Sequence, residues 1–403
     1  MTRVSRRQFL VGSSVLGALG VAGISAVTWD ELQQRASVSP LAAGSGILVV
    51  LTLYGGNDGL NTVIPYADNA YHDARPELSY RPEEVLHLDS QLGLNPAMKG
   101  LADLWRDKSL AIVRGVGYPQ PDHSHFRSMD IWQTAAPGSA APGSAVPTGW
   151  IGRWLDATGD DPIRAVNIGS VLPQLALGTK HTAAALDPSS APLSPTLSAA
   201  LSGLAATDPA DTTAQDCVCI GYQSEQTVTK TFSSITPPDK SKKAANPLAA
   251  QLDLVSQCVK AGVPTRVYSV SLGGFDTHAD ERHTQEQLLG RFDEAVSGFL
   301  RDMAAHPRGK DVVLLAYSEF GRRVHANASQ GTDHGTAGPV FVAGAPVKGG
   351  WYGDEPSLTD LDNGDLKTTV DFRDVYNELL QKVVSTDPVP VVGAGRRDLG
   401  FLA

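Results

Sequence analysis

Continuous apolar runs alternate with amphipathic stretches along most of the chain. The runs that we predict to be buried strands are residues 46–53, 110–116, 165–168, 265–271, 311–317 and 338–343. Between them, helical patterns predict helices near residues 97–105, 126–133, 284–305 and 371–384. Apolar strands that alternate with amphipathic helices are typical of an α/β fold. The pattern therefore predicts a mostly parallel central sheet flanked by helices.

Three segments interrupt this alternation. Residues 135–147, 189–211 and 233–246 are rich in Pro, Ala, Ser, Gly or Lys, which predicts inserted loops. Of the 403 residues, 42% are hydrophobic and 19% are charged, a composition that favours a globular domain with a sizeable core. We expect residues 1–44 to be a leader and residues 45–403 to form a single α/β domain that carries these loops.

The first residues carry the strongest local signal. Ser5-Arg6-Arg7-Gln8-Phe9-Leu10 precedes an uncharged stretch from Val11 to Thr28 that is rich in Gly, Ala and Val. This pattern resembles a twin-arginine signal peptide, with small residues near 22–26 or 42–43 where a peptidase could cut. The resemblance implies export through the twin-arginine translocation machinery to the periplasm, the cell surface or the medium. An uncleaved membrane anchor is the alternative interpretation.

Charge and cysteine content narrow the class of protein further. The 33 basic and 43 acidic residues give a net charge of −10, which excludes a general role in binding nucleic acid. No stretch beyond the N-terminus is apolar for about 18 residues, so no internal membrane span is expected. Cys217, Cys219 and Cys258 are odd in number and imply no disulfide framework. Buried thiols are the favoured interpretation, and a bridge from Cys258 to either of the others is the alternative.

Candidate metal ligands gather at the ends of the predicted strands. The residues are Asp58, Asp276, His278, Glu319 and His334, of which the first four follow strands and the last precedes the strand at 338–343. Ligands of open α/β sheets bind outside the carboxyl ends of the strands. Carboxylates and imidazoles that converge there would bind a divalent cation such as zinc, manganese, magnesium or calcium.

Each ligand also has a purely structural interpretation. Asp58 lies in Gly55-Gly56-Asn57-Asp58-Gly59, a composition typical of tight turns. Asp276 could cap a helix, with a bystander histidine two residues later. Glu319 could pair with Arg322 or Arg323, which follow it closely.

Ser124 is the candidate nucleophile. It precedes the predicted helix at 126–133, where free N–H groups and the helix dipole favour an anion. A neighbouring metal would also make its hydroxyl easier to deprotonate. His123 and His125 flank it, and we assign His125 to the catalytic set, while one of the two is expected to be structural. Ser128, one turn later, is the rival nucleophile, and a simple helix cap at Ser124 is the structural alternative.

Five motifs together resemble one family. They are Gly-Gly-Asn-Asp-Gly-Leu-Asn (55–61), Ser-His-Phe (124–126), Gly-Gly-Phe-Asp-Thr-His (273–278), Ser-Glu-Phe-Gly-Arg (318–322) and Thr-Asp-His-Gly (332–335). The set is similar to the DUF1501 proteins, exported bacterial proteins of undefined activity that are related to the alkaline phosphatase and sulfatase superfamily. The resemblance runs from about residue 46 to residue 385 and implies an alkaline-phosphatase-like fold.

The resemblance implies a site with two metals and a nucleophile between them. By position, Asp58 resembles the first metal-binding aspartate and Ser124 the nucleophile. Asp276, His278 and His334 look like ligands of one metal. Glu319 looks like a ligand of the other metal, shared with Asp58.

The chain departs from the superfamily pattern in two places. The usual Asp-His pair after the late strand is Glu319-Phe320 here, so the second metal lacks an imidazole that His125 or His123 could replace. The Cys/Ser-x-Pro-x-Arg segment that sulfatases convert to formylglycine is absent.

Three functional hypotheses follow from these residues. The first is an exported metal-dependent hydrolase of phosphate or sulfate esters, acting on a small-molecule or glycan ester. The second is a metal-bound extracytoplasmic protein that binds a ligand with little or no catalysis. The third is another metal-dependent reaction on the same scaffold, such as isomerisation or transfer.

Overall fold

The computed structural model describes residues 25–27, 29–136, 146–159, 161–169, 171–186 and 246–402. Most of the predicted leader, the predicted loops except for a few flanking residues, and Cys217 and Cys219 lie outside these residues. Cys258 is buried and forms no disulfide with any residue that the structure describes. Within the described part of the chain, no helix is both long enough and apolar enough to cross a membrane.

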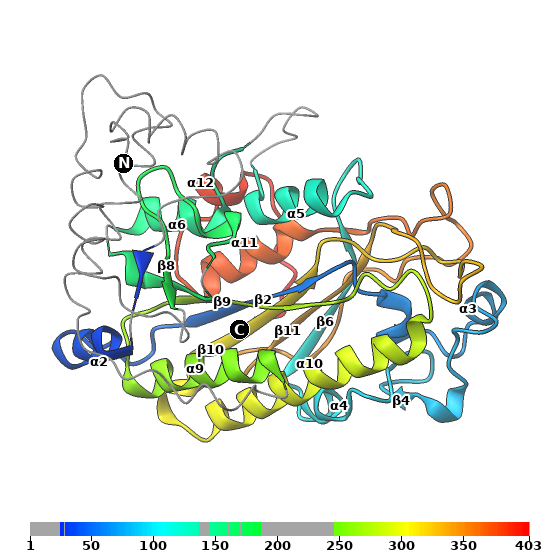
Figure 1. Ribbon diagram of the computed structural model, residues 1–403, viewed down its shortest axis with the longest axis horizontal. Coiled ribbons are helices and arrows are strands. Elements are labelled where there is room, and N and C mark those ends of the chain that lie inside the picture. The colour runs from blue at the N-terminus through cyan, green and yellow to red at the C-terminus, as the bar shows by residue number, and fades with distance from the viewer. Residues whose placement is uncertain are drawn as a thin grey trace, which may run out of the picture.

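A ten-stranded sheet forms the centre of the molecule (Figure 1). Its order is β1-β8-β7-β9-β2-β10-β11-β6-β12, and β13 also pairs with β6. The strands are β1 (Ser25–Ala26), β2 (Ile47–Tyr54), β6 (Leu110–Gly117), β7 (Ala165–Ile168), β8 (Ala184–Leu186), β9 (Val267–Gly273), β10 (Val312–Ser318), β11 (Gly338–Ala343), β12 (Gly350–Tyr352) and β13 (Val370–Asp371). A small antiparallel sheet joins β3 (Val63–Ile64), β5 (Gly93–Leu94) and β4 (Leu86–His87).

The described helices cover both faces of the sheet. They are α2 (Trp29–Val38), α3 (Asn69–Ala74), α4 (Lys99–Arg106), α5 (His125–Thr134), α6 (Trp150–Thr158), α9 (Pro247–Ala261), α10 (Glu281–Ala304), α11 (Phe372–Lys382) and α12 (Val389–Val392). In Figure 1, α4, α9 and α10 lie below the sheet, and α5, α6, α11 and α12 lie above it. This is the predicted class, an α/β fold with a mostly parallel sheet flanked by helices.

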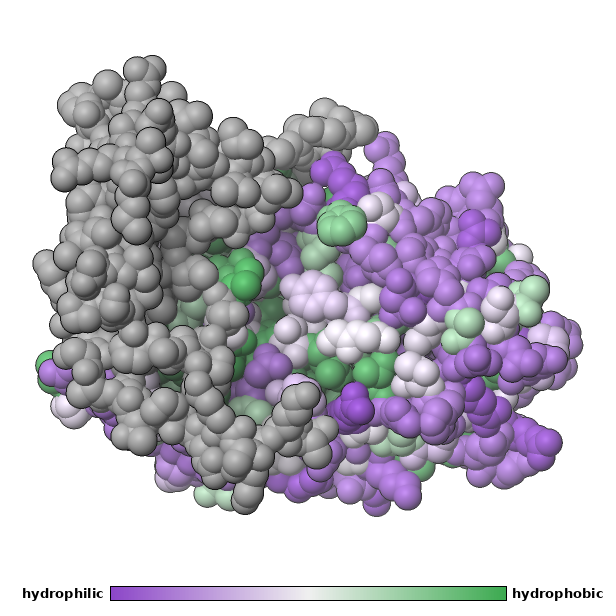
Figure 2. Space-filling model, viewed as in Figure 1, coloured by the Kyte–Doolittle hydropathy of each residue, from purple (hydrophilic) through white to green (hydrophobic). Residues whose placement is uncertain are grey.

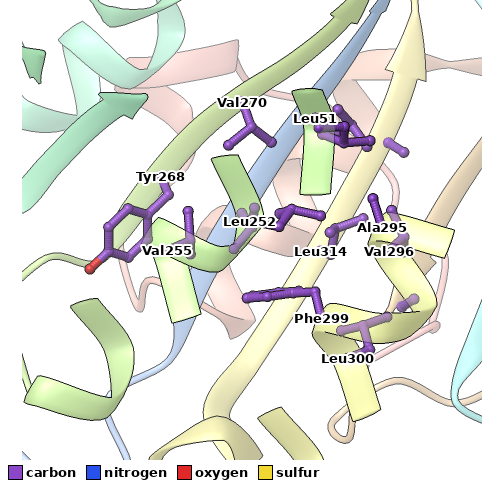
Figure 3. Close-up of a cluster of buried hydrophobic side chains, with 14 of the residues drawn as sticks. Leu51, Leu252, Val255, Tyr268, Val270, Ala295, Val296, Phe299, Leu300 and Leu314 are labelled. Carbon is purple, nitrogen blue, oxygen red and sulfur yellow. The ribbon is translucent and has the colours of Figure 1, made fainter. Parts of the chain in front are cut away.

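Alternation along the strands builds one core on each face. In β2, Val49 and Leu51 enter the core under α9 and α10, whereas Leu48 and Val50 enter the core under α6 and α11. Successive side chains of a strand point to opposite faces, so a continuous apolar run serves both cores. Figure 3 shows the first core, where side chains of β2, β9 and β10 meet those of α9 and α10. Figure 2 shows a mostly hydrophilic outer surface, with hydrophobic residues visible mainly in the central hollow.

The predicted strands at 46–53, 110–116, 265–271 and 311–317 are confirmed as parallel strands of one sheet, each within two residues of its bounds. The predicted helices are found at α4, α5, α10 and α11. The sequence did not lead us to α6 or α9, or to the short strands β8, β12 and β13. Helix α9 follows directly on a segment rich in polar residues and is capped by the Asn246 side chain, which accepts a hydrogen bond from the Ala249 N–H.

One strand runs against the others. Strand β11 pairs antiparallel with both β10 and β6. The carboxyl ends of the parallel strands meet at one edge of the sheet, and an antiparallel strand begins at that same edge. The loop that precedes β11 therefore reaches the edge where β2, β9 and β10 end. This topology brings residues 332–335 to the other strand-end motifs.

Candidate metal centre

Three segments deliver four titratable side chains to this edge. His125 is the first residue of α5, Asp276 and His278 lie in the loop after β9, and His334 lies in the loop before β11. Ligand atoms of His125, Asp276 and His334 all lie within 4.8 Å of one another. His278 completes the group, because its Nε2 lies 2.9 Å from Nε2 of His334. We call these four residues the imidazole cluster.

The centre of the imidazole cluster is one oxygen of Asp276. Its Oδ1 lies 3.3 Å from Nε2 of His125, 3.0 Å from Nε2 of His278 and 3.2 Å from Nε2 of His334. Nη2 of Arg322 approaches the same oxygen to 2.9 Å. A carboxylate oxygen has about two lone-pair sites, so it cannot accept four good hydrogen bonds at once. The nitrogens are gathered more closely than hydrogen bonding to Asp276 explains.

A hydrogen bond at Nδ1 of His334 determines that its Nε2 carries the lone pair. Nδ1 of His334 lies 2.7 Å from the carbonyl oxygen of His123. Because a carbonyl can only accept, Nδ1 of His334 carries the proton in the neutral ring, and the lone pair of Nε2 faces the cluster. Burial lowers the pKa of His334, which favours this neutral form. A metal-binding histidine is typically oriented by such a second hydrogen bond.

Glu319 plays the same part for His125. Its Oε1 lies 2.8 Å from Nδ1 of His125, and that hydrogen bond is the largest cause of the raised pKa of this histidine. Nε2 of His125 is buried and has no hydrogen-bond partner. A carboxylate that holds Nδ1 while Nε2 faces the other ligand atoms is the arrangement found behind metal-bound imidazoles.

The spacing of the cluster suits a small divalent cation. A tetrahedral ion with ligand distances of about 2.0 Å separates its ligand atoms by about 3.3 Å. The separations of 2.9–3.3 Å within the imidazole cluster approach that value. Although partial burial would raise it, the hydrogen bond and positive charge of Arg322 lower the pKa of Asp276 to about 2, so this carboxylate is ionised. His125, Asp276 and His334 therefore fit a cation with two nitrogen ligands and one oxygen ligand, and His278 lies next to His334 and Asp276.

Glu319 itself is buried and already engaged by neighbouring groups. Oε1 also accepts a hydrogen bond from the Gly55 N–H at 2.9 Å, and Oε2 lies 2.9 Å from the Ser318 hydroxyl. Only 2% of its surface is exposed. The sequence led us to expect a direct ligand, and the structure places Glu319 behind His125 instead.

Asp58 also differs from the expectation, because it lies outside the imidazole cluster. Its side chain is fully buried, and its Oδ2 lies 2.5 Å from Nη1 of Arg75, also fully buried. Burial alone would raise the pKa of Asp58, but Arg75 and a hydrogen bond from Glu281 hold it below its usual value. Burial and the Asp58 charge raise the pKa of Glu281. We call Asp58, Arg75 and Glu281 the buried triad.

Ser124 lies between two residues that are fastened to the imidazole cluster. On one side, the carbonyl of His123 accepts the hydrogen bond from His334, and on the other side is His125. Ser124 is exposed and stands at the N-cap of α5, where its side chain makes no capping hydrogen bond. Its hydroxyl is therefore not committed to the helix.

The rival Ser128 is committed elsewhere. It is fully buried, and its hydroxyl lies 2.6 Å from the carbonyl oxygen of Asp122 and 2.8 Å from the hydroxyl of Tyr118. Its role is to hold the turn that precedes α5. His123 is likewise engaged, because its Nε2 lies 2.8 Å from Oδ2 of the buried Asp365.

Arg322 joins the loops around the site. Its guanidinium donates hydrogen bonds to the carbonyl oxygens of Gly55, Gly56, Phe275 and Thr332, as well as to Asp276. Gly55 and Gly56 allow this close approach. Both have positive φ, and a Cβ at Gly55 would lie 2.5 Å from the backbone nitrogen of Asp276.

Several of these roles were not visible in the sequence. Arg322 and Arg323 were considered only as partners of Glu319, whereas Arg322 contacts Asp276 and Arg323 lies 3.7 Å from Asp365. Arg75 and Glu281 carried no signal, because one lies at the end of the short helix α3 and the other at the start of α10. Only their burial reveals them.

The fold and the site thus define an α/β protein with a candidate centre for a divalent cation. A family model described as "Protein of unknown function (DUF1501)" matches residues 200–392, in agreement with the resemblance predicted from the motifs. No curated protein matches the chain.

Solved structures similar to the chain include a protein in the alkaline phosphatase superfamily from Vibrio parahaemolyticus, with 12% identity, a TM-score of 0.44, and coverage of 92% of this chain and 77% of that one. Alkaline phosphatase from the Antarctic bacterium TAB5 has 12% identity, a TM-score of 0.35, and coverage of 76% and 92%. The lipoteichoic acid synthase LtaP from Listeria monocytogenes has 8% identity, a TM-score of 0.39, and coverage of 93% and 81%. At these identities and TM-scores, the activities of those proteins do not transfer to this chain.

Proposed function

We propose that the chain is a metal-dependent hydrolase of phosphate or sulfate esters. The observation that carries the proposal is the imidazole cluster, in which three Nε2 atoms surround one ionised carboxylate oxygen. Three imidazoles favour a borderline cation such as zinc over magnesium or calcium, which prefer oxygen ligands. Asp276, His125, His278 and His334 would hold the cation, which would supply Lewis-acid chemistry to a bound ester.

The chain's own groups provide the rest of the reaction. The free N–H groups at the start of α5 would bind the anionic oxygens of the ester beside Ser124. The Ser124 oxygen would form a bond to phosphorus or sulfur while the bond to the leaving oxygen breaks, and the proton of the Ser124 hydroxyl would pass to that leaving oxygen to give the alcohol. Water would then hydrolyse the serine ester and restore the hydroxyl. Glu319 and the His123 carbonyl would keep the rings of His125 and His334 aimed at the centre throughout.

A matched pair of serine variants tests this proposal. The protein would be loaded with Zn²⁺ or Mn²⁺ and assayed with p-nitrophenyl phosphate, bis-p-nitrophenyl phosphate and p-nitrophenyl sulfate. Ser124→Ala should retain its metal and lose at least about 10³-fold in kcat, as expected for a nucleophile. Ser128→Ala should keep most of the activity, because that hydroxyl serves the fold. Normal turnover by Ser124→Ala would exclude Ser124 as the nucleophile.

One observation favours a second candidate function. Phe320 stands where the family resemblance leads one to expect a metal-binding imidazole, and it is buried. A protein with an incomplete catalytic site could bind its ligand through the metal without turnover. Full metal loading together with no turnover of any of the three esters would support this binding protein over the hydrolase.

We also propose that the chain is exported by the twin-arginine pathway. The support is the Arg6-Arg7 pair and the uncharged stretch that follows it. Replacing both arginines with lysine should retain the protein in the cytoplasm, which fractionation and immunoblotting would detect. Unchanged export of the double variant would contradict this route.

A further inference from the structure

We propose that the site holds one divalent cation and that two buried arginines, Arg75 and Arg322, take the place of a second one. The inference rests on the metal site proposed above and goes beyond it, because the family resemblance implies two metals. Each residue that would serve a second metal is engaged elsewhere in this structure. These residues are Asp58, Glu319 and Phe320.

Asp58 is already neutralised. Its Oδ2 receives the hydrogen bond from Nη1 of Arg75 at 2.5 Å, and its Oδ1 receives one from the Leu60 N–H at 3.3 Å. The remaining donors of Arg75 are fixed as well, since Nε and Nη2 each lie 2.8 Å from a backbone carbonyl, of Val324 and Arg323 respectively. A cation next to Asp58 would have to displace a fully buried guanidinium whose other donors are already fixed on backbone carbonyls. Such a displacement would leave a buried charge without a partner, at a cost of several kcal/mol.

Glu319 is also engaged, chiefly through Oε1. Its two oxygens meet the Gly55 N–H, Nδ1 of His125 and the Ser318 hydroxyl, all at 2.8–2.9 Å. Binding a metal would break the hydrogen bond that orients His125. Glu319 therefore cannot serve a second metal without weakening the first.

Phe320 fills the remaining position. Its ring centroid lies 4.8 Å from that of His125 and 4.8 Å from that of His334. A phenyl ring has no lone pair to donate, and Phe320 places an apolar surface against the rings of His125 and His334. A Cβ on Gly56 would lie 2.3 Å from this ring, so the loop after β2 fits against the phenyl group only with glycine at that position.

Arg322 supplies the missing positive charge. It contacts Asp276 directly at 2.9 Å, and its charge also lowers the pKa of Asp58. It thus lies where it acts on both aspartates, as a bridging cation would. All of its nitrogens donate to protein acceptors, so the guanidinium is fixed in place. Two carboxylates and two guanidiniums balance there without a second metal.

Metal counting on the full-length protein tests the inference. Protein saturated with Mn²⁺ alone should contain one Mn²⁺ per chain by elemental mass spectrometry. Its electron paramagnetic resonance spectrum should be that of an isolated ion, without the exchange coupling of a pair. Two ions per chain or a coupled spectrum would overturn the inference and leave the hydrolase intact. One ion without ester turnover would support it while the hydrolase fails, and no bound metal would overturn both.

Two variants locate the ion. Asp276→Asn should lower the Mn²⁺ content toward zero, whereas Asp58→Asn should keep one ion per chain. If Asp58→Asn lost the metal while its circular dichroism stayed native, Asp58 would be a ligand and the inference would be wrong. Should Asp58→Asn fail to fold, the wild-type spectrum alone still decides between one ion and two.

Discussion

Asp58 and Asp276 occupy equivalent places in neighbouring loops and have opposite surroundings. Strands β2 and β9 pair in parallel, with Tyr54 opposite Gly273, and each aspartate follows its strand by a few residues. The Asp58 side chain is fully buried against Arg75, whereas 49% of the Asp276 side chain is exposed beside three imidazoles. The chain thus uses one carboxylate as part of its interior and the other as a candidate ligand.

The comparison teaches that the partner decides the role of a carboxylate. A guanidinium is always charged and cannot leave, so it commits Asp58 to the fold. Imidazoles with free Nε2 atoms can instead share a cation that comes from solution. Both loops begin with Gly-Gly near the end of a strand, and nothing in that local sequence distinguishes them.

The largest effect is expected from breaking the buried pair. Asp58→Asn should lower the free energy of unfolding of the metal-free protein by about 3 kcal/mol, the lower end for a broken buried pair, because Glu281 can ionise beside Arg75. Asp58→Asn combined with Glu281→Gln should cost more than the sum of the two changes, because Arg75 then has no carboxylate. Urea unfolding measures both. Asp276→Asn, the matched control on the exposed side, should cost about 1 kcal/mol or less.

At pH 6, a smaller effect of opposite sign is expected from Glu281. Its pKa is raised in the folded state, so folded protein binds more protons than unfolded protein and the group costs stability as pH rises above about 4.5. Glu281→Gln removes that cost. Relative to wild type, the variant should be nearly neutral at pH 5 and should gain up to about 1.4 kcal/mol per pH unit above it. Stability curves that stay parallel from pH 5 to pH 8 would show that Glu281 is ionised in the fold.

The smallest effect is expected from Glu319, the residue that holds His125, and it concerns the affinity for Zn²⁺. Glu319→Gln should weaken Zn²⁺ binding about tenfold, the lower end for a lost outer hydrogen-bond partner, because the amide oxygen can still accept from His125. The change should also lower the pKa of His125, so the pH below which the affinity for Zn²⁺ begins to fall should be lower than in wild type. Competition with a chelating indicator across pH 5–8 measures both. Unchanged affinity and an unchanged pH midpoint would contradict the role assigned to Glu319.

The sequence predicted the sheet well because its strands are continuous apolar runs with no competing pattern. It also placed Asp276, His278 and His334 at one edge, since strand ends converge whatever the side chains do. It could not assign Asp58, because the partner that removes Asp58 from the site lies 17 residues away in a short helix. Nor could it show that Glu319 supports His125, because that contact spans 194 residues. Partner choice depends on packing between distant segments, which local pattern does not encode.

Arg322 bears on the order in which the loops fold and the proposed cation binds. Its hydrogen bonds tie together the loops after β2 and β9 and the loop before β11, with no ion required. The positive charge of Arg322 is part of the polypeptide, so it does not depend on the supply of transition metals. For the metal site proposed above, the loops joined by Arg322 would form first, and uptake of the cation would be a separate, later step.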